Sequence, residues 1–173
     1  LGYEAIEEYE MANEYLEKAV NSCQKVKDKK NLLEAYANQI ENYAKLGKFE
    51  EGIATFQKGI ALSKEITSET FKADLYSNLG LLEATQNDYE GALSHYDEAV
   101  QILVPDFEPT TSTPNPVPSQ YKIQSKYDLL MVLTRKADVL MQKGKRDNNL
   151  FMLKDALQTY GNINELITTI RLD

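Results

Sequence analysis

The side chains best suited to chemistry in this sequence are Cys23 and His95, its single cysteine and single histidine. A cysteine nucleophile needs an imidazole beside it to take the thiol proton, so that the thiolate can attack. Here the two residues fall in different helical segments, and neither lies near a glycine-rich turn. We therefore expect Cys23 to be a half-buried packing residue, His95 to lean towards the surface of a helix, and the chain to have no catalytic residue.

Metal and cofactor sites are not indicated either. A zinc site needs three or four closely spaced ligands, which one cysteine and one histidine do not supply. The sequence contains no P-loop and no Gly-x-Gly-x-x-Gly motif. Neighbouring carboxylates such as Glu50 and Glu51 fall at expected helix starts, where acidic side chains favour the helix dipole. We expect neither a metal nor a cofactor.

The charge of the chain restricts its partners. It has 19 basic and 27 acidic residues and a net charge of −8. Nucleic-acid binding requires clustered lysines and arginines, which are dispersed here, so we do not expect it. No apolar run approaches the roughly 18 residues of a membrane span, and no signal peptide is recognisable. We expect a soluble, cytoplasmic segment, and because the sequence opens with Leu1 in a helical pattern, a segment of a longer protein.

A single pattern of apolar and small residues recurs along the chain at a step of forty residues. Its positions are a small residue, a large apolar residue four further on, and another small residue three beyond that. The three copies are Ala12, Leu16 and Ala19; Gly52, Phe56 and Gly59; and Ala92, Tyr96 and Ala99. This spacing is one face of a helix, and small residues there allow two antiparallel helices to approach closely. Gly47 and Asn87 are expected to end the preceding helices, because both tolerate positive φ.

The recurrence predicts an all-α fold of about four tandem antiparallel helical hairpins in one domain spanning residues 1–173. A partial first repeat covers residues 1–29, with one helix from about Tyr3 to Lys27. The second and third repeats cover residues 30–67 and 68–104. All five prolines fall within residues 105–119, which we expect to be a non-helical loop and most simply a tolerated surface excursion. From Tyr121 the helical period returns, and residues 120–173 form the terminal hairpin.

The third repeat resembles the tetratricopeptide repeat (TPR). The resemblance lies in Asn78-Leu79-Gly80 of its first helix, in the turn Asn87-Asp88-Tyr89, and in Ala92, Tyr96 and Ala99 of its second helix. The usual period of that family is about 34 residues, so a step of forty implies longer helices. The resemblance implies a superhelical array whose first helices line a concave, protein-binding surface.

Residues 103–173 are similar to the repeats that precede CHAT domains, the caspase-like protease domains associated with TPRs in bacteria. The similarity rests on Leu133 to Asp138, Leu153 to Tyr160 and Leu166 to Arg171. It implies a scaffold or regulatory segment of a larger bacterial protein, with a protease domain beyond Asp173 as a possible intramolecular partner. The alternative is a peptide-sensing or scaffolding array of another signalling protein, such as a kinase or a transcription regulator.

The register of the first helices identifies candidate residues for a groove that binds a protein or peptide ligand. They are Glu34, Ala37, Glu41, Lys45, Asp74, Ser77, Leu81, Thr85, Asp138 and Met141. The acidic members favour a basic peptide, with Leu81 and Met141 as apolar contacts. The same positions could instead be solvated or pack against a neighbouring domain, and the sequence does not decide between these readings.

Overall fold

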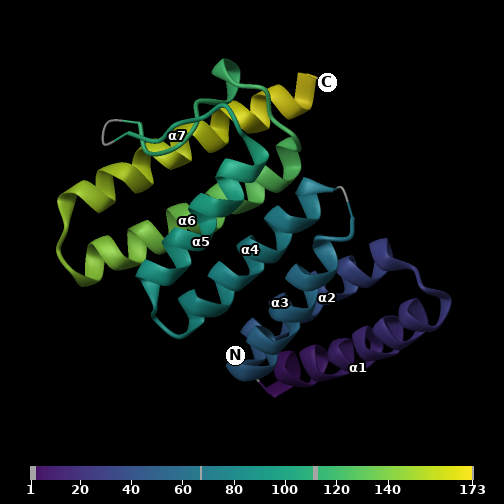
Figure 1. Ribbon diagram of the computed structural model, residues 1–173. Helices are drawn as coiled ribbons and strands as arrows, with labels where there is room; N and C mark the ends of the chain where they lie inside the picture. The colour runs from purple at the N-terminus through teal and green to yellow at the C-terminus, as the bar shows by residue number, and fades with distance from the viewer. Residues whose placement is uncertain (1–2, 67, 111–112, 173) are drawn as a thin grey trace.

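The computed structural model describes residues 3–66, 68–110 and 113–172, and these residues are helical apart from short turns and one long connection (Figure 1). They contain seven α-helices, one short 3-10 helix and no strand. The α-helices are α1 (Tyr3–Val26), α2 (Lys29–Leu46), α3 (Phe49–Ser63), α4 (Glu69–Thr85), α5 (Tyr89–Leu103), α6 (Lys126–Arg146) and α7 (Leu150–Leu172); the 3-10 helix η1 is Pro118–Gln120.

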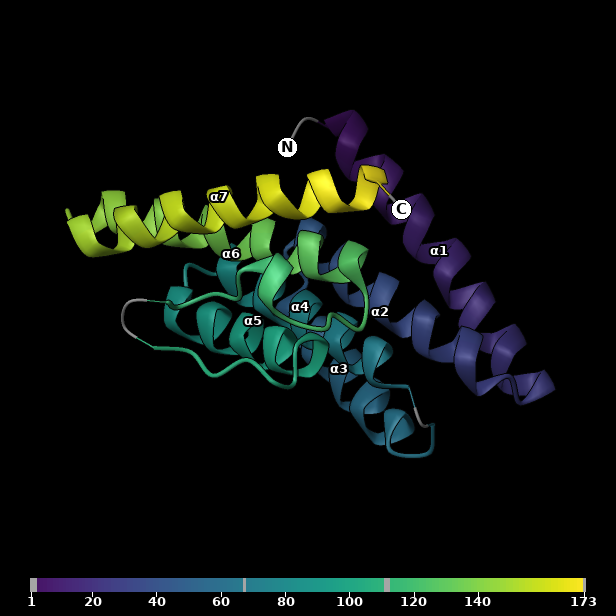
Figure 2. The same ribbon diagram turned by 90° about the horizontal axis from the view of Figure 1, so that it is seen from above.

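The helices form tandem hairpins, as the forty-residue recurrence predicts. Each of the pairs α2 and α3, α4 and α5, and α6 and α7 packs together, while α1 packs on α2 (Figures 1 and 2). The first helices of successive hairpins are neighbours, because α2 packs on α4 and α4 packs on α6. The all-α hairpin array is therefore confirmed, and α2, α4 and α6 form one continuous layer.

The helix ends follow from local sequence. The carboxylates of Asp28 and Asp88 cap α2 and α5 by accepting hydrogen bonds from the backbone N–H groups of Asn31 and Gly91, at 3.1 and 3.0 Å. Gly47 lies directly after α2 with φ of 69°, and Asn87 occupies the equivalent turn with φ of 62°. Both expected positive-φ positions are confirmed, and each lets the chain reverse into the second helix of its hairpin.

Small residues bring the paired helices close together. Gly80 of α4 faces α5 so closely that an added Cβ atom would lie 2.8 Å from Cε1 of Tyr96 and 3.0 Å from the carbonyl oxygen of Ala92. The ring of Tyr96 is fully buried and belongs to the larger of two apolar clusters, which runs from α4 to α7. The smaller cluster joins α2, α3 and α4. The two clusters meet at α4, which contributes to both.

The proline-rich connection is packed over part of its length: Phe107 is buried, as are Asn115, Pro116 and Pro118, so the expected surface excursion holds only for its exposed first part. We call residues 105–110 and 113–119 the proline strap; these residues run beside α7 between the ends of α5 and α6 (Figure 2). Asn115 is completely buried and donates a 2.7 Å hydrogen bond to the hydroxyl of Thr159. Asn162 donates to the carbonyl oxygen of Pro116 at 2.9 Å, and the ammonium of Lys136 lies 2.6 Å from Asn115 Oδ1. Side chains of α6 and α7 thus satisfy a backbone that cannot form its own helix.

The terminal hairpin begins later than the apolar period suggests. Helix α6 starts at Lys126, where the Ser125 side chain accepts a hydrogen bond from the backbone N–H of Asp128. Tyr121 is not helical; its ring packs edge-on against Phe107, with ring centroids 5.4 Å apart. Pro118 begins the 3-10 helix, which its fixed φ allows. The apolar residues before α6 therefore extend the core without extending the helix.

Two glycine substitutions test the close packing of α4 on α5. Gly80→Ala should lower the free energy of unfolding by roughly 1–2 kcal/mol, because the new methyl group meets the Ala92 carbonyl, which cannot turn away as a side chain could. Gly161→Ala on α7 is the matched control: its added Cβ has no neighbour within 4 Å, so helix propensity alone should raise stability by about 0.5–1 kcal/mol. Urea unfolding measures both, and equal effects would contradict the packing argument.

Lys136→Met tests the anchoring of the proline strap. The Lys136 ammonium contacts Asp97, the Pro114 carbonyl and Asn115, and its removal leaves a buried amide oxygen without its donor. We expect a loss of about 2–3 kcal/mol in urea unfolding. Lys29→Met removes an exposed ion pair with Glu65 and should cost less than about 1 kcal/mol. Similar losses for the two lysines would show that the strap is not held through Lys136.

Candidate functional site

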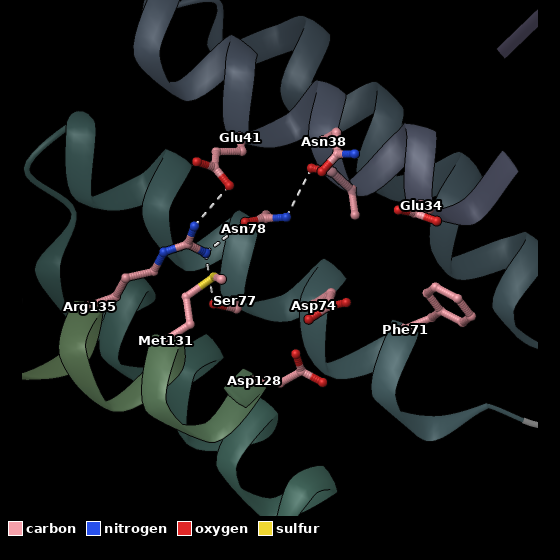
Figure 3. A pocket seen from close by; sticks show the side chains of 11 residues that line it. Glu34, Asn38, Glu41, Phe71, Asp74, Ser77, Asn78, Asp128, Met131 and Arg135 are labelled. Atoms are coloured by element: carbon pink, nitrogen blue, oxygen red, sulfur yellow. Dashed lines mark hydrogen bonds and ion pairs between the residues drawn. The ribbon is translucent and has the colours of Figure 1, made fainter. Parts of the chain in front are cut away.

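A hollow of about 310 Å³ opens on the layer formed by the first helices of the three hairpins (Figure 3). Each of these helices contributes side chains about one turn apart, so one face of each helix points into it. The lining consists of Glu34, Ala37, Asn38 and Glu41 from α2; Phe71, Asp74, Ser77 and Asn78 from α4; and Asp128, Met131 and Arg135 from α6.

Arg135 binds to both of the other first helices from one side of the hollow. Its guanidinium donates to Glu41 Oε2 at 3.0 Å, to Ser77 Oγ at 2.9 Å and to Asn78 Oδ1 at 2.7 Å (Figure 3). The amide of Asn78 in turn donates to the carbonyl oxygen of Ala37 at 2.9 Å. Helices α2, α4 and α6 are thus connected through a single cation and one amide.

Glu41 is the anionic partner of this network. Burial raises the pKa of its carboxyl, but the hydrogen bond from Lys45 and the charges of Arg135 and Lys45 outweigh burial and leave the pKa below its usual range. The Lys45 ammonium lies 2.7 Å from Glu41 Oε1. Glu41 is therefore ionised and fully engaged, and its negative charge is already neutralised within the protein.

Asp74 is in the opposite situation. Within the described residues its carboxylate accepts no hydrogen bond and forms no ion pair. Burial, followed by the charges of Asp128 and Glu34, raises its pKa to about 7, although the charge of Arg135 acts in the opposite direction. These three carboxyl groups come from α4, α6 and α2 and lie around the same hollow (Figure 3). This side of the hollow therefore carries an excess of negative charge, which the more distant charge of Arg135 offsets only in part.

Two apolar side chains complete the lining. Phe71 is half-buried on α4, and Met131 on α6 leaves 49% of its surface exposed. Lys30 places its ammonium 5.9 Å from the centre of the Phe71 ring, on the rim of the hollow. The hollow thus offers apolar contact surface directly beside unpaired carboxylates.

The structure brings half of the expected groove residues together. Glu34, Ala37, Glu41, Asp74 and Ser77 line the hollow. The other five lie nearer the C-terminal ends of the same helices and are not part of its lining: Lys45, Leu81, Thr85, Asp138 and Met141. Lys45 still reaches it indirectly through Glu41, and Asp138 accepts a 2.7 Å hydrogen bond from the Tyr160 hydroxyl of α7. Phe71 and Met131 occupy the apolar role expected of Leu81 and Met141.

Sequence reasoning missed six lining residues: Asn38, Phe71, Asn78, Asp128, Met131 and Arg135. On α6 the expected residues Asp138 and Met141 lie about one to two turns beyond the residues that line the hollow. The signal was nevertheless present, because Asp128, Met131 and Arg135 repeat the three-then-four spacing of Phe71, Asp74 and Asn78. Aligning α6 with α4 on that spacing would have found them.

Cys23 and His95 lie on α1 and α5, which do not pack together. Cys23 is half-buried. The Nδ1 atom of His95 lies 2.6 Å from Glu83 Oε2, and its ring stacks on Tyr76. Among the described residues no group of three histidine, cysteine or acidic side chains could hold a metal ion, and none of the described helices is long and apolar enough to cross a membrane.

Two comparisons with known proteins give matches to this chain. Regulatory protein RapG of Bacillus subtilis (strain 168) is 34% identical to this chain over 73 residues, which make up 42% of the chain and 20% of RapG. The match thus spans only about a fifth of that relative. Residues 31–103, which run from the start of α2 to the end of α5, match the family profile of the tetratricopeptide repeat.

Proposed function

We propose that this chain is a protein-interaction module that holds a peptide segment in the hollow lined by α2, α4 and α6. The observation that carries the proposal is the convergence of three successive first helices on one concave site with both apolar surface and unpaired charge. The tetratricopeptide match of α2 to α5 supports it, because such arrays use their concave surfaces for binding.

The chemistry of the hollow favours a ligand with a basic side chain next to an apolar one. A guanidinium or ammonium group between Asp74 and Asp128 would be attracted by both carboxylates and by Glu34 in a partly desolvated site. Phe71 and Met131 would then cover the neighbouring apolar side chain. Arg135 does not attract an anionic ligand, since its charge is already shared among Glu41, Ser77 and Asn78.

For the whole protein we propose a regulatory role in the cytoplasm, with residues 1–173 as one repeat domain. The similarity to a protein described as regulatory supports this coarse role. The two finer possibilities are a segment attached to a caspase-like CHAT domain and an array of another signalling protein. Sequencing the complete reading frame separates them, because the first requires a downstream histidine and cysteine, each at the end of a strand.

Neutralising single carboxylates tests the groove. The probe is a fluorescein-labelled hexapeptide with one arginine flanked by leucines, and the ligand control carries citrulline instead of arginine. Asp74→Asn and Asp128→Asn should each weaken probe binding roughly tenfold in fluorescence anisotropy, because each removes one desolvated charge partner. Asp106→Asn, an exposed change in the proline strap, should leave the affinity unchanged. Equal affinity of the arginine and citrulline peptides would refute the groove.

The raised pKa of Asp74 predicts a pH dependence of the same binding. Below pH 7 Asp74 is mostly protonated and cannot attract a cation; above pH 7 it is ionised and can. Affinity for the arginine peptide should therefore rise about tenfold from pH 6 to pH 8, following the ionised fraction. The Asp74→Asn variant should lose this dependence, and a wild-type affinity that does not change over this range would contradict the assignment.

A further inference from the structure

Arg135 makes a contact between hairpins that are not neighbours in the array. Helix α2 packs on α1, α3 and α4, whereas α6 packs on α4, α5 and α7, and α2 and α6 do not pack on one another. The guanidinium of Arg135 nevertheless reaches across α4 to Glu41 on α2 (Figure 3). The α2/α3 and α6/α7 hairpins are therefore joined by a charged side-chain contact, and the length of this contact limits how far apart the two hairpins can move.

The contact has the properties of a firm connection. Arg135 is only 14% exposed, and both donors of its Nη1 atom are used, one by Ser77 and one by Asn78. Charge-assisted hydrogen bonds in such a partly desolvated position are stronger than surface ion pairs. Since Asn78 is also fixed to the backbone of Ala37, any movement of α6 away from α2 breaks several hydrogen bonds together.

An opposing force acts at the other side of the hollow. Glu34, Asp74 and Asp128 belong to the same three helices, and Asp74 feels the charges of the other two as repulsion. Like charges in a partly desolvated site push the helices that carry them apart. The Arg135 contacts and, when Asp74 is ionised, the repulsion among these carboxylates therefore act in opposite directions on the side of α2, α4 and α6 that lines the hollow.

We infer that Arg135 is a positioning residue that holds the three first helices at the separation where one ligand cation can contact carboxylates from all of them. This inference rests on the proposed function. A bound cation would cancel the repulsion and draw the helices together, so it acts in the same direction as Arg135. Without Arg135 the three first helices move apart. Part of the binding free energy of the ligand is then used to bring them together, so its affinity falls.

Pulsed EPR distance measurements test this role. Spin labels are attached at Glu10→Cys on α1 and Lys154→Cys on α7, both exposed and outside the hollow, in a Cys23→Ser background. Arg135→Met should broaden the label distance distribution and shift it to longer distances. Saturating arginine hexapeptide should restore the wild-type distribution, while its affinity for the variant falls about tenfold. A merely structural arginine would not give this ligand-dependent recovery.

Two further variants keep the test decisive. Glu41→Gln removes the anionic partner but leaves Arg135 bonded to α4, so it should broaden the distribution less than Arg135→Met and without unfolding. Arg171→Met, an exposed change on α7, is the control for loss of an arginine and should have no effect. Unchanged distributions in folded Arg135→Met and Glu41→Gln would overturn the role of Arg135. Failure of the wild type to bind the arginine peptide would overturn the proposed function instead, because the ligand-free distributions do not depend on it.

Discussion

The close approach of neighbouring helices at small residues, both within a hairpin and between hairpins, is the constraint on which the rest of this structure depends. Gly80 admits the ring of Tyr96, and Gly52 and Gly59 of α3 admit Leu82 and Leu75 of α4 in the same way. Each of these contacts fixes a helix separation that larger residues would widen. All three contacts involve α4, so they fix the distance from α4 to α3 and from α4 to α5. These distances also determine how the first helices of successive hairpins are spaced in the concave layer.

Buried polar contacts fix the position of α6 relative to α4, which the apolar packing alone does not fix. The clusters of leucine, alanine and tyrosine would tolerate some sliding of α6 along α4, since apolar contact is not directional. Arg135 removes that freedom on the concave side of α6. Lys136, the next residue, does so towards the proline strap by binding Asn115 and Asp97. Two adjacent cations thus orient the terminal hairpin from both sides. Lys136 is buried, Arg135 is 14% exposed, and each is paired with a carboxylate.

The hairpins themselves could be predicted because their signals are local and periodic. Gly47 and Asn87 mark turns through their own backbone preference, and Ala92, Tyr96 and Ala99 mark a helix face through spacing alone. The packing of the strap could not be predicted, because it depends on Thr159 and Asn162, more than forty residues away in the chain. Prolines reveal where a helix is impossible, but they do not reveal which distant side chains will satisfy the backbone there.

The candidate site was predictable only in the part that follows the repeat. Glu34, Glu41 and Asp74 were found because α2 and α4 keep the same register. Arg135 was missed because its role requires Glu41, 94 positions earlier, and a helix that starts at Lys126.

The hollow contains two kinds of acidic residue. Glu41 is neutralised by Arg135 and Lys45 and stabilises the array, whereas Asp74 forms no ion pair within the described residues, and its partly buried charge costs stability. A carboxyl group with a raised pKa beside an intact scaffold suits the proposed binding of a cation, because a ligand cation that pairs with it offsets the free-energy cost of its ionisation in a partly buried site.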